Sequence, residues 1–111
     1  MAATGALLPV AWGTPVGLTS ALVLPANPSR SALVFVNSSV SGAIAIIPAT
    51  ANIAATQGAY VGSSVGVAAI NGAGSVTMQP GDKFIIDTLQ CSTAWNGIAS
   101  GTGGQLTILE S

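Results

Sequence analysis

The chain has 111 residues, of which 50% are hydrophobic and only 5% are charged. This length supports one domain with a single core, whereas the charged fraction is far below the roughly 25% that is usual in globular proteins. Charge normally keeps proteins apart in solution, so this surface is poorly protected against association. We therefore expect much of the surface to serve as an interface.

The few charged and reactive residues exclude several functional classes. The two basic residues, Arg30 and Lys83, are too few to neutralise a nucleic-acid backbone. A single cysteine, Cys91, and the absence of histidine leave no intrachain disulfide, no multi-cysteine zinc site and no usual general base. The sequence therefore predicts a protein that is not an enzyme, has no metal or other cofactor and does not bind nucleic acid.

A membrane partner is not expected either. The longest uncharged run, residues 31–81, is interrupted by Asn37, Gly42, Pro48 and Asn52 before ~20 apolar residues accumulate. Residues 1–12 contain no Lys or Arg, so they lack the charged start of a secretory signal.

Short apolar runs separated by Gly, Pro, Asn and Ser indicate an all-β chain. We expect an N-terminal arm or edge strand in residues 1–16, with a turn at 12–15, and a β-sandwich domain in residues 17–111. Residues 17–24 predict a strand that is covered on both faces. Residues 25–29 contain two prolines and predict a corner, at which the chain changes sheet.

The most convincing strand follows this corner, in residues 32–36, because β-branched and aromatic residues favour strands. A second compact strand is expected at 43–47. Residues 49–74 are rich in small residues, and we interpret them as a long excursion with weak edge strands near 59–61 and 67–70. A loop of this length is uncommon unless it has a function, and we expect it to contact another subunit.

Two hairpins are predicted after the excursion. Residues 75–79 and 83–87 form the first, joined by a Pro-Gly pair that suits a type II turn. The second joins residues 94–100 to 105–110 through a glycine-rich turn, residues 101–104. The total of about seven to nine short strands is typical of a single antiparallel β-sandwich or jelly-roll-like domain.

No residue pattern indicates catalysis. Asp82 and Asp87 would lie ~17 Å apart along an extended strand, too far to share a proton or form a glycosidase pair. Cys91 has no histidine to activate it, so we interpret it as a structural thiol.

Arg30 is the most informative charged residue, because a buried arginine in a nearly uncharged chain needs a partner. The possible partners are Asp82, Asp87, Glu110 and the terminal carboxylate. Two interpretations remain open. The first is an ion pair that locks the corner or joins subunits, and the second is a solvated side chain without a role.

The aromatic residues also allow two interpretations. Trp12 and Trp95 suit a core or an interface, where tryptophan is a frequent anchor. Trp12, Trp95 and Tyr60 are also candidates for stacking on a sugar ring. We favour the core or interface interpretation for both tryptophans.

The order of several short motifs is distinctive. An Asn27-Pro28-Ser29-Arg30 corner precedes a strand that ends at Asn37, and a Pro80-Gly81 turn and a closing strand that ends in Leu109-Glu110 follow. Over residues 17–110 this order resembles the small β-sandwich structural proteins of tailed-bacteriophage virions.

The resemblance implies a capsid decoration protein, made in the bacterial cytoplasm and carried on the virion surface. Such a protein binds the major capsid protein or other virion proteins between capsomers, often as a homo-trimer. We expect the assembly contacts to include Arg30, Trp12, Tyr60, Trp95 and Glu110. The alternative is a head-fibre or tail accessory protein that binds a host surface glycan.

Overall fold

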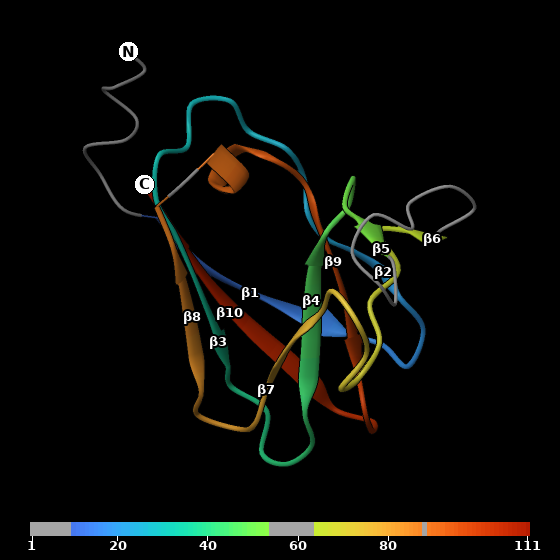
Figure 1. Cartoon of the computed structure of the whole chain (residues 1–111). Coiled ribbons are helices and arrows are strands. Elements are labelled where there is room, and N and C mark those ends of the chain that lie inside the picture. Colours follow the sequence, from blue (N-terminus) through green and yellow to red (C-terminus); the bar gives the residue numbers. More distant parts are fainter. Residues whose placement is uncertain (1–9, 54–63, 88) are drawn as a thin grey trace.

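The structure is a computed structural model that describes residues 10–53, 64–87 and 89–111. The described residues form two four-stranded antiparallel sheets. The two sheets face each other (Figure 1), which confirms the predicted β-sandwich. Sheet A contains, in spatial order, β1 (Val10–Val16), β10 (Gly104–Glu110), β3 (Leu33–Asn37) and β8 (Lys83–Ile86). Sheet B contains β2 (Ala21–Leu24), β9 (Trp95–Ala99), β4 (Ile44–Pro48) and β7 (Val76–Met78).

Two smaller elements complete the described part of the chain. β5 (Asn52–Ile53) and β6 (Ser64–Val65) pair with each other, and η1 (Leu89–Ser92) is a short 3-10 helix. Within the described ranges, no helix has the length and apolar character needed to cross a membrane.

The topology is that of a jelly roll. Strands at equal distance from the middle of the chain pair with each other, so β1 pairs with β10, β2 with β9, β3 with β8 and β4 with β7. β10 also pairs with β3, and β9 also pairs with β4. These two additional pairs join the four strand pairs into two sheets. Among the eight sandwich strands, each strand and the next along the chain lie in opposite sheets, except β4 and β7, which pair within sheet B. The predicted change of sheet between residues 25 and 37 is therefore confirmed.

Both predicted hairpins are wrong. The Pro80-Gly81 turn has the expected form, because Asp82 N donates to Gln79 O at 2.9 Å and Gly81 has a φ of 89°. However, this turn joins β7 in sheet B to β8 in sheet A, and residues 100–103 likewise join β9 to β10 across the sandwich. Turn chemistry is local and does not determine whether the flanking strands pair with each other.

The N-terminal part of the sandwich also differs from the sequence prediction. The turn expected at 12–15 is part of β1, which pairs with β10 along its whole length. Pro15 is tolerated because β1 is an edge strand. The strand expected at 17–24 is shortened to β2, and as an edge strand it is not covered on both faces, since Leu22 is 59% exposed.

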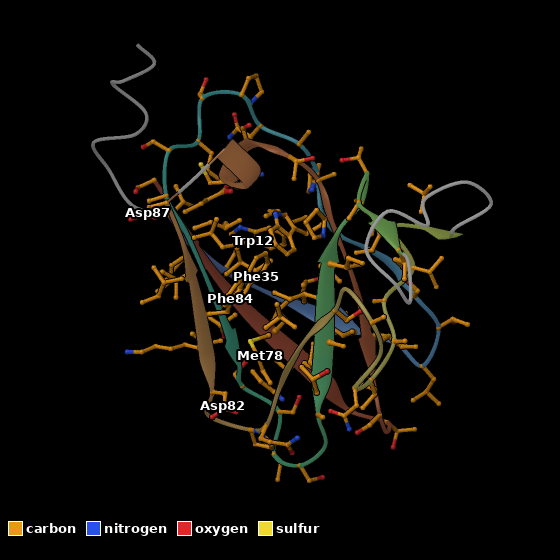
Figure 2. The ribbon with its side chains drawn as sticks, viewed as in Figure 1. Trp12, Phe35, Met78, Asp82, Phe84 and Asp87 are labelled. Carbon is orange, nitrogen blue, oxygen red and sulfur yellow. The ribbon has the colours of Figure 1, made fainter. Side chains whose placement is uncertain are left out.

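The core lies between the inner faces of the two sheets. Alternate residues of β3 and β10, such as Phe35 and Ile108, are fully buried there. The Trp95 ring centroid lies 5.2 Å from that of Phe35 and 6.4 Å from that of Phe84. Figure 2 shows Phe35, Phe84 and Trp12 between the sheets. The core interpretation of Trp95 is therefore correct.

The described residues of the excursion after β4 pack on part of the outer face of sheet B. Ile47 points outward from the sandwich core, yet it is completely buried, and Gly74 lies beside its side chain. Asn96 Nδ2 on β9 donates to Gly66 O at 2.7 Å, and Ala68 N donates to Ser20 Oγ at 2.9 Å. The described residues of the excursion thus pack on their own chain, and its contact with another subunit remains a prediction.

The weak strands expected in the excursion are not those observed. Residues 59–61 lie outside the described ranges, and residues 67–70 do not form a strand. The observed pair is β5–β6, which holds the two ends of the excursion together.

The attachment of the excursion depends on Gly66, which has a φ of +64° and whose added Cβ would lie 2.1 Å from the Ala49 carbonyl oxygen. We expect Gly66→Ala to lower the free energy of unfolding by about 2 kcal/mol. Gly101 has open space around it, so Gly101→Ala is the matched control and should stay within about 0.5 kcal/mol of the wild type. Urea denaturation measures both. Equal stabilities for the two variants would show that the excursion is not fixed at Gly66.

Candidate functional site

Arg30 lies buried where the corner after β2, η1 and the end of β10 meet. Its Nε donates to Cys91 O, its Nη2 donates to Thr93 O at 2.8 Å, and its Nη1 donates to Pro25 O at 3.3 Å. The same Nη1 forms an ion pair with Glu110 Oε2 at 2.9 Å. One side chain therefore holds three segments that are far apart in sequence.

The structure selects Glu110 among the four partners that the sequence allowed for Arg30. The Arg30 side chain is only 2% exposed, so the interpretation as a solvated side chain is wrong. Burial of a charge is costly unless it is paired and hydrogen-bonded, and Arg30 meets both conditions within one chain. Arg30 and Glu110 therefore lock the corner, and a role for them in assembly remains a prediction.

Cys91 belongs to the same corner. Its thiol is buried and donates a weak hydrogen bond to Arg30 O, with an Sγ–O distance of 3.4 Å. This placement is that of a structural thiol.

The outer face of sheet A carries a row of apolar residues, several of which are exposed. The strand registers place Ala11, Leu109, Val34 and Ile85 side by side across β1, β10, β3 and β8. We call these four residues the apolar row. Ile85 is 61% and Leu109 38% exposed. Exposed apolar residues that are contiguous, rather than scattered singly, mark sites of interaction.

The next row on the same face is mixed. It contains Gly13, Thr107, Val36 and Lys83, again one residue from each strand. Lys83 is thus the single charged residue that the strands of sheet A present on this face, and it lies at the margin, on edge strand β8.

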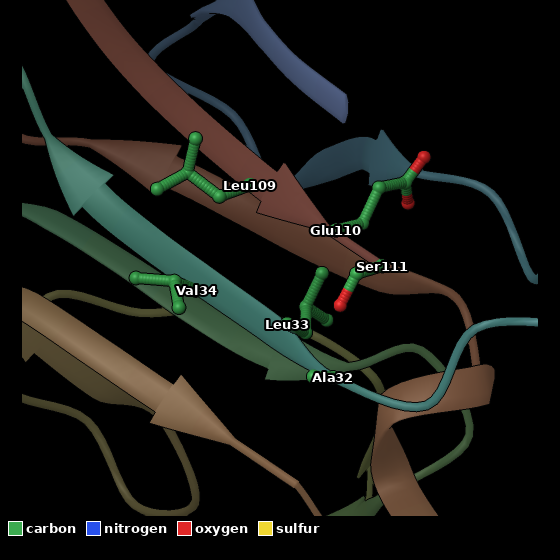
Figure 3. Close-up of a pocket in the computed structure, with 6 residues that line it drawn as sticks. All are labelled: Ala32, Leu33, Val34, Leu109, Glu110 and Ser111. Carbon is green, nitrogen blue, oxygen red and sulfur yellow. The ribbon is translucent and has the colours of Figure 1, made fainter. Parts of the chain in front are cut away.

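A shallow pocket lies at the end of the apolar row near the C-terminus (Figure 3). It has a volume of about 200 Å³ and is lined by Ala32, Leu33, Val34, Leu109, Glu110 and Ser111. Pockets for small molecules usually have roughly 300–1,000 Å³. The one side-chain carboxylate in the lining, that of Glu110, is already paired with Arg30. The pocket is therefore smaller than a usual small-molecule site.

The remaining candidates are dispersed. Trp12 is half-buried and packs against the core. Trp95 is 3% exposed, so its proposed roles as an interface anchor and as a sugar platform are wrong, because its ring lies between the sheets. Tyr60 lies outside the described residues. Asp82 and Asp87 lie at opposite ends of β8, as expected (Figure 2).

The described residues contain no group of three or more His, Cys, Asp or Glu side chains that could hold a metal ion. The apolar row was the feature that sequence reasoning missed. Its signal was present in the alternation of β10, in which Leu109 falls on the side opposite Leu106 and Ile108. Recognising it required the strand order, which places residues from four distant segments in one row.

The Arg30 corner makes a direct prediction about stability. Arg30→Ala leaves Glu110 and three backbone carbonyls without their donor, and we expect the free energy of unfolding to fall by about 3 kcal/mol. Arg30→Lys should recover only part of this loss, because an ammonium group cannot reproduce the planar guanidinium fork. Gln79→Ala, at an exposed position, is the control and should change stability by less than about 0.5 kcal/mol. Urea denaturation measures the stability of each variant. If Arg30→Ala were as stable as the control, Arg30 would not lock the corner.

Comparison with known proteins gives a fold relationship. No protein-family model and no curated protein sequence matches the chain. Among solved structures, the chain is similar to the stem and receptor binding domain of the spike protein P1 of bacteriophage PM2, with 18% identity and a TM-score of 0.52. The match covers 84% of this chain but 29% of that chain.

Two further solved structures show weaker similarity. A protein from Neisseria meningitidis has 15% identity and a TM-score of 0.42, over 92% of this chain and 70% of that one. A protein of Bacillus endospore appendages has 18% identity and a TM-score of 0.27, over 94% of this chain and 85% of that one. The chain therefore has a β-sandwich fold that a domain of a bacteriophage spike protein shares.

Proposed function

We propose that this chain is a bacteriophage virion structural protein, and specifically a capsid decoration protein that binds between capsomers. It acts by assembly and catalyses no reaction. The observation that carries this proposal is the exposed apolar row on sheet A, in a chain of which only 5% of residues are charged.

Burial of the apolar row supplies the driving force for binding. Removal of apolar surface from water contributes roughly 25 cal/mol per Å², and Ile85 of the row, at the edge of the sheet, is 61% exposed. A rigid surface loses little conformational entropy on docking, which favours affinity. Each copy would contribute a modest binding free energy, and many copies on one shell would together stabilise it strongly.

The fold and charges support the same proposal. Jelly rolls recur in viral capsid domains, and the similarity to a phage spike domain is a likeness of fold. Of the two basic residues, Arg30 forms an ion pair with Glu110. Only Lys83 is left to contact a nucleic-acid phosphate. The proposed partner is therefore the major capsid protein or another virion protein, and the proposed location is the capsid surface.

Binding to virus particles tests this proposal. Val34 lies in the apolar row, half-buried between Leu109 and Ile85, so Val34→Asp places a charge within the contact. Val40 lies in the loop between β3 and β4 and is completely exposed, so Val40→Asp is a control with the same chemical change. We expect Val34→Asp to weaken binding at least about tenfold and Val40→Asp to bind like the wild type.

The assay mixes each folded variant with particles assembled without the chain and measures co-sedimentation. Circular dichroism confirms that each variant is folded. Failure of the wild type to bind, or equal binding by Val34→Asp and Val40→Asp, would contradict the proposal.

A second candidate function is binding of a host surface glycan. It is favoured by one observation, the fold shared with a stem and receptor binding domain of a phage spike. The structure removes one argument for it, because Trp95 is in the core. A glycan array tests it directly, and we expect no glycan to bind. Saturable binding of one glycan class would overturn this expectation and favour the fibre or spike role.

A further inference from the structure

We propose that a second copy of this chain binds along edge strand β8, antiparallel and related by a two-fold axis. The two A sheets would then form one continuous sheet. This inference goes beyond the proposed function and holds whether or not the chain binds a capsid.

The backbone of β8 has a free hydrogen-bonding edge. Asn37 N donates to Asp82 O at 3.0 Å, which marks residues 37 and 82 as a hydrogen-bonded pair of the β3–β8 ladder. Such pairs recur at every second residue of an antiparallel ladder, so the backbone groups of Phe84 and Ile86 face β3. Those of Lys83, Ile85 and Asp87 therefore face away from the sheet. Within the described ranges, β8 pairs with β3 alone.

The opposite edge of sheet A does not offer the same surface. Ser38 N donates to Gln105 O at 3.0 Å, so odd-numbered residues of β10 bond to β3 and even-numbered residues bond to β1. The backbone of Pro15, which pairs with Gln105 in register, consequently faces the free edge of β1. Proline has no N–H, and its presence on an edge discourages further pairing. The exposed edge of β8 carries no proline.

The side chains on this edge form a self-complementary pattern. Lys83, Ile85 and Asp87 alternate along one line on the outer face and are all exposed. Among the described residues the ion pair is that of Arg30 with Glu110, and neither Lys83 nor Asp87 takes part in one. A lysine alone on an edge strand discourages pairing. Here an aspartate follows it four residues later, with an isoleucine midway.

A two-fold axis at Ile85 gives each charged side chain and each free backbone group of this edge a partner in the second copy. With Ile85 opposite Ile85 of the second copy, Lys83 of each copy faces Asp87 of the other. Opposite charges at directly facing positions stabilise antiparallel pairs. The same register makes residues 83, 85 and 87 hydrogen-bonded pairs, so the free N–H and C=O groups are used in both copies.

The register also extends the apolar row. Leu109, Val34 and Ile85 of one copy continue directly into Ile85, Val34 and Leu109 of the other. An interface in which the same patch meets itself is closed at two copies. The β8 edge thus specifies a dimer, in place of the trimer that the virion resemblance implies.

Charge exchange tests this dimer in the full chain. Sedimentation equilibrium should show that the wild type is a dimer. Lys83→Asp places two pairs of like charges opposite each other, and Asp87→Lys does the same with the opposite sign. We expect each single variant to weaken dimerisation at least about tenfold.

Two further samples restore the complementary pattern. The double variant Lys83→Asp/Asp87→Lys should dimerise like the wild type. An equimolar mixture of the two single variants should form a heterodimer, because each Asp of one then faces a Lys of the other. Val40→Asp introduces an aspartate at an exposed site outside β8 and should remain dimeric, which shows whether a new charge elsewhere on the surface has an effect. Circular dichroism confirms the fold of each variant.

The proposal would be overturned by a wild type that stays monomeric or forms a trimer. It would equally be overturned if the single variants dimerise as tightly as the wild type, or if their mixture stays monomeric.

Discussion

The buried guanidinium of Arg30 is the interaction on which one end of this sandwich depends. A jelly roll brings strands from opposite ends of the chain together, so its loops must be joined by long-range contacts. Arg30 joins the corner after β2, the segment around η1 and the end of β10 through three carbonyls and the Glu110 carboxylate. A single charge can do this because all of its partners are supplied by the same chain and water is largely excluded.

At the other end of the sandwich, the side-chain amide of Asn37 has the role that the charged Arg30 has at the first end. Asn37 is fully buried at the end of β3, where its Nδ2 donates to Met78 O at 2.8 Å and to Gly42 O at 3.0 Å. Its Oδ1 accepts from Ser39 N at 3.0 Å. β3 therefore begins after Arg30 and ends at Asn37, with a polar lock at each end and apolar packing between them. This arrangement explains how a chain with so few charges keeps a defined geometry.

The sequence predicts the strands of this protein better than their arrangement. Local patterns locate most sandwich strands, and the two prolines and Arg30 mark a true change of sheet. The hairpins were wrong because Pro80-Gly81 specifies a tight turn without specifying whether the next strand joins the same sheet. Trp12 to Pro15 was mistaken for a turn because proline is tolerated on an edge strand, and an edge position is a property of the complete sheet.

The candidate site was also only partly predictable, because it depends on how the strands are arranged in the complete sheets. Glu110 was one of four possible partners of Arg30, and only the fold brings it within 2.9 Å. The apolar row could not be predicted, because its four members come from β1, β3, β8 and β10 and meet only through the strand order. The sandwich also treats its two outer faces differently. The described residues of the excursion cover part of sheet B, including Ile47, whereas Ile85 and Leu109 of the apolar row on sheet A stay exposed.

The central claim is that this exposed face is where the protein binds its partner on a virion. The most direct measurement is a cryo-electron microscopy map of the virus particle that carries the chain. The account predicts a jelly roll on the capsid surface whose sheet A, with Val34 and Leu109, lies against the shell. A map in which sheet A faces solvent while the excursion contacts the shell would contradict it, as would a virion that lacks the chain.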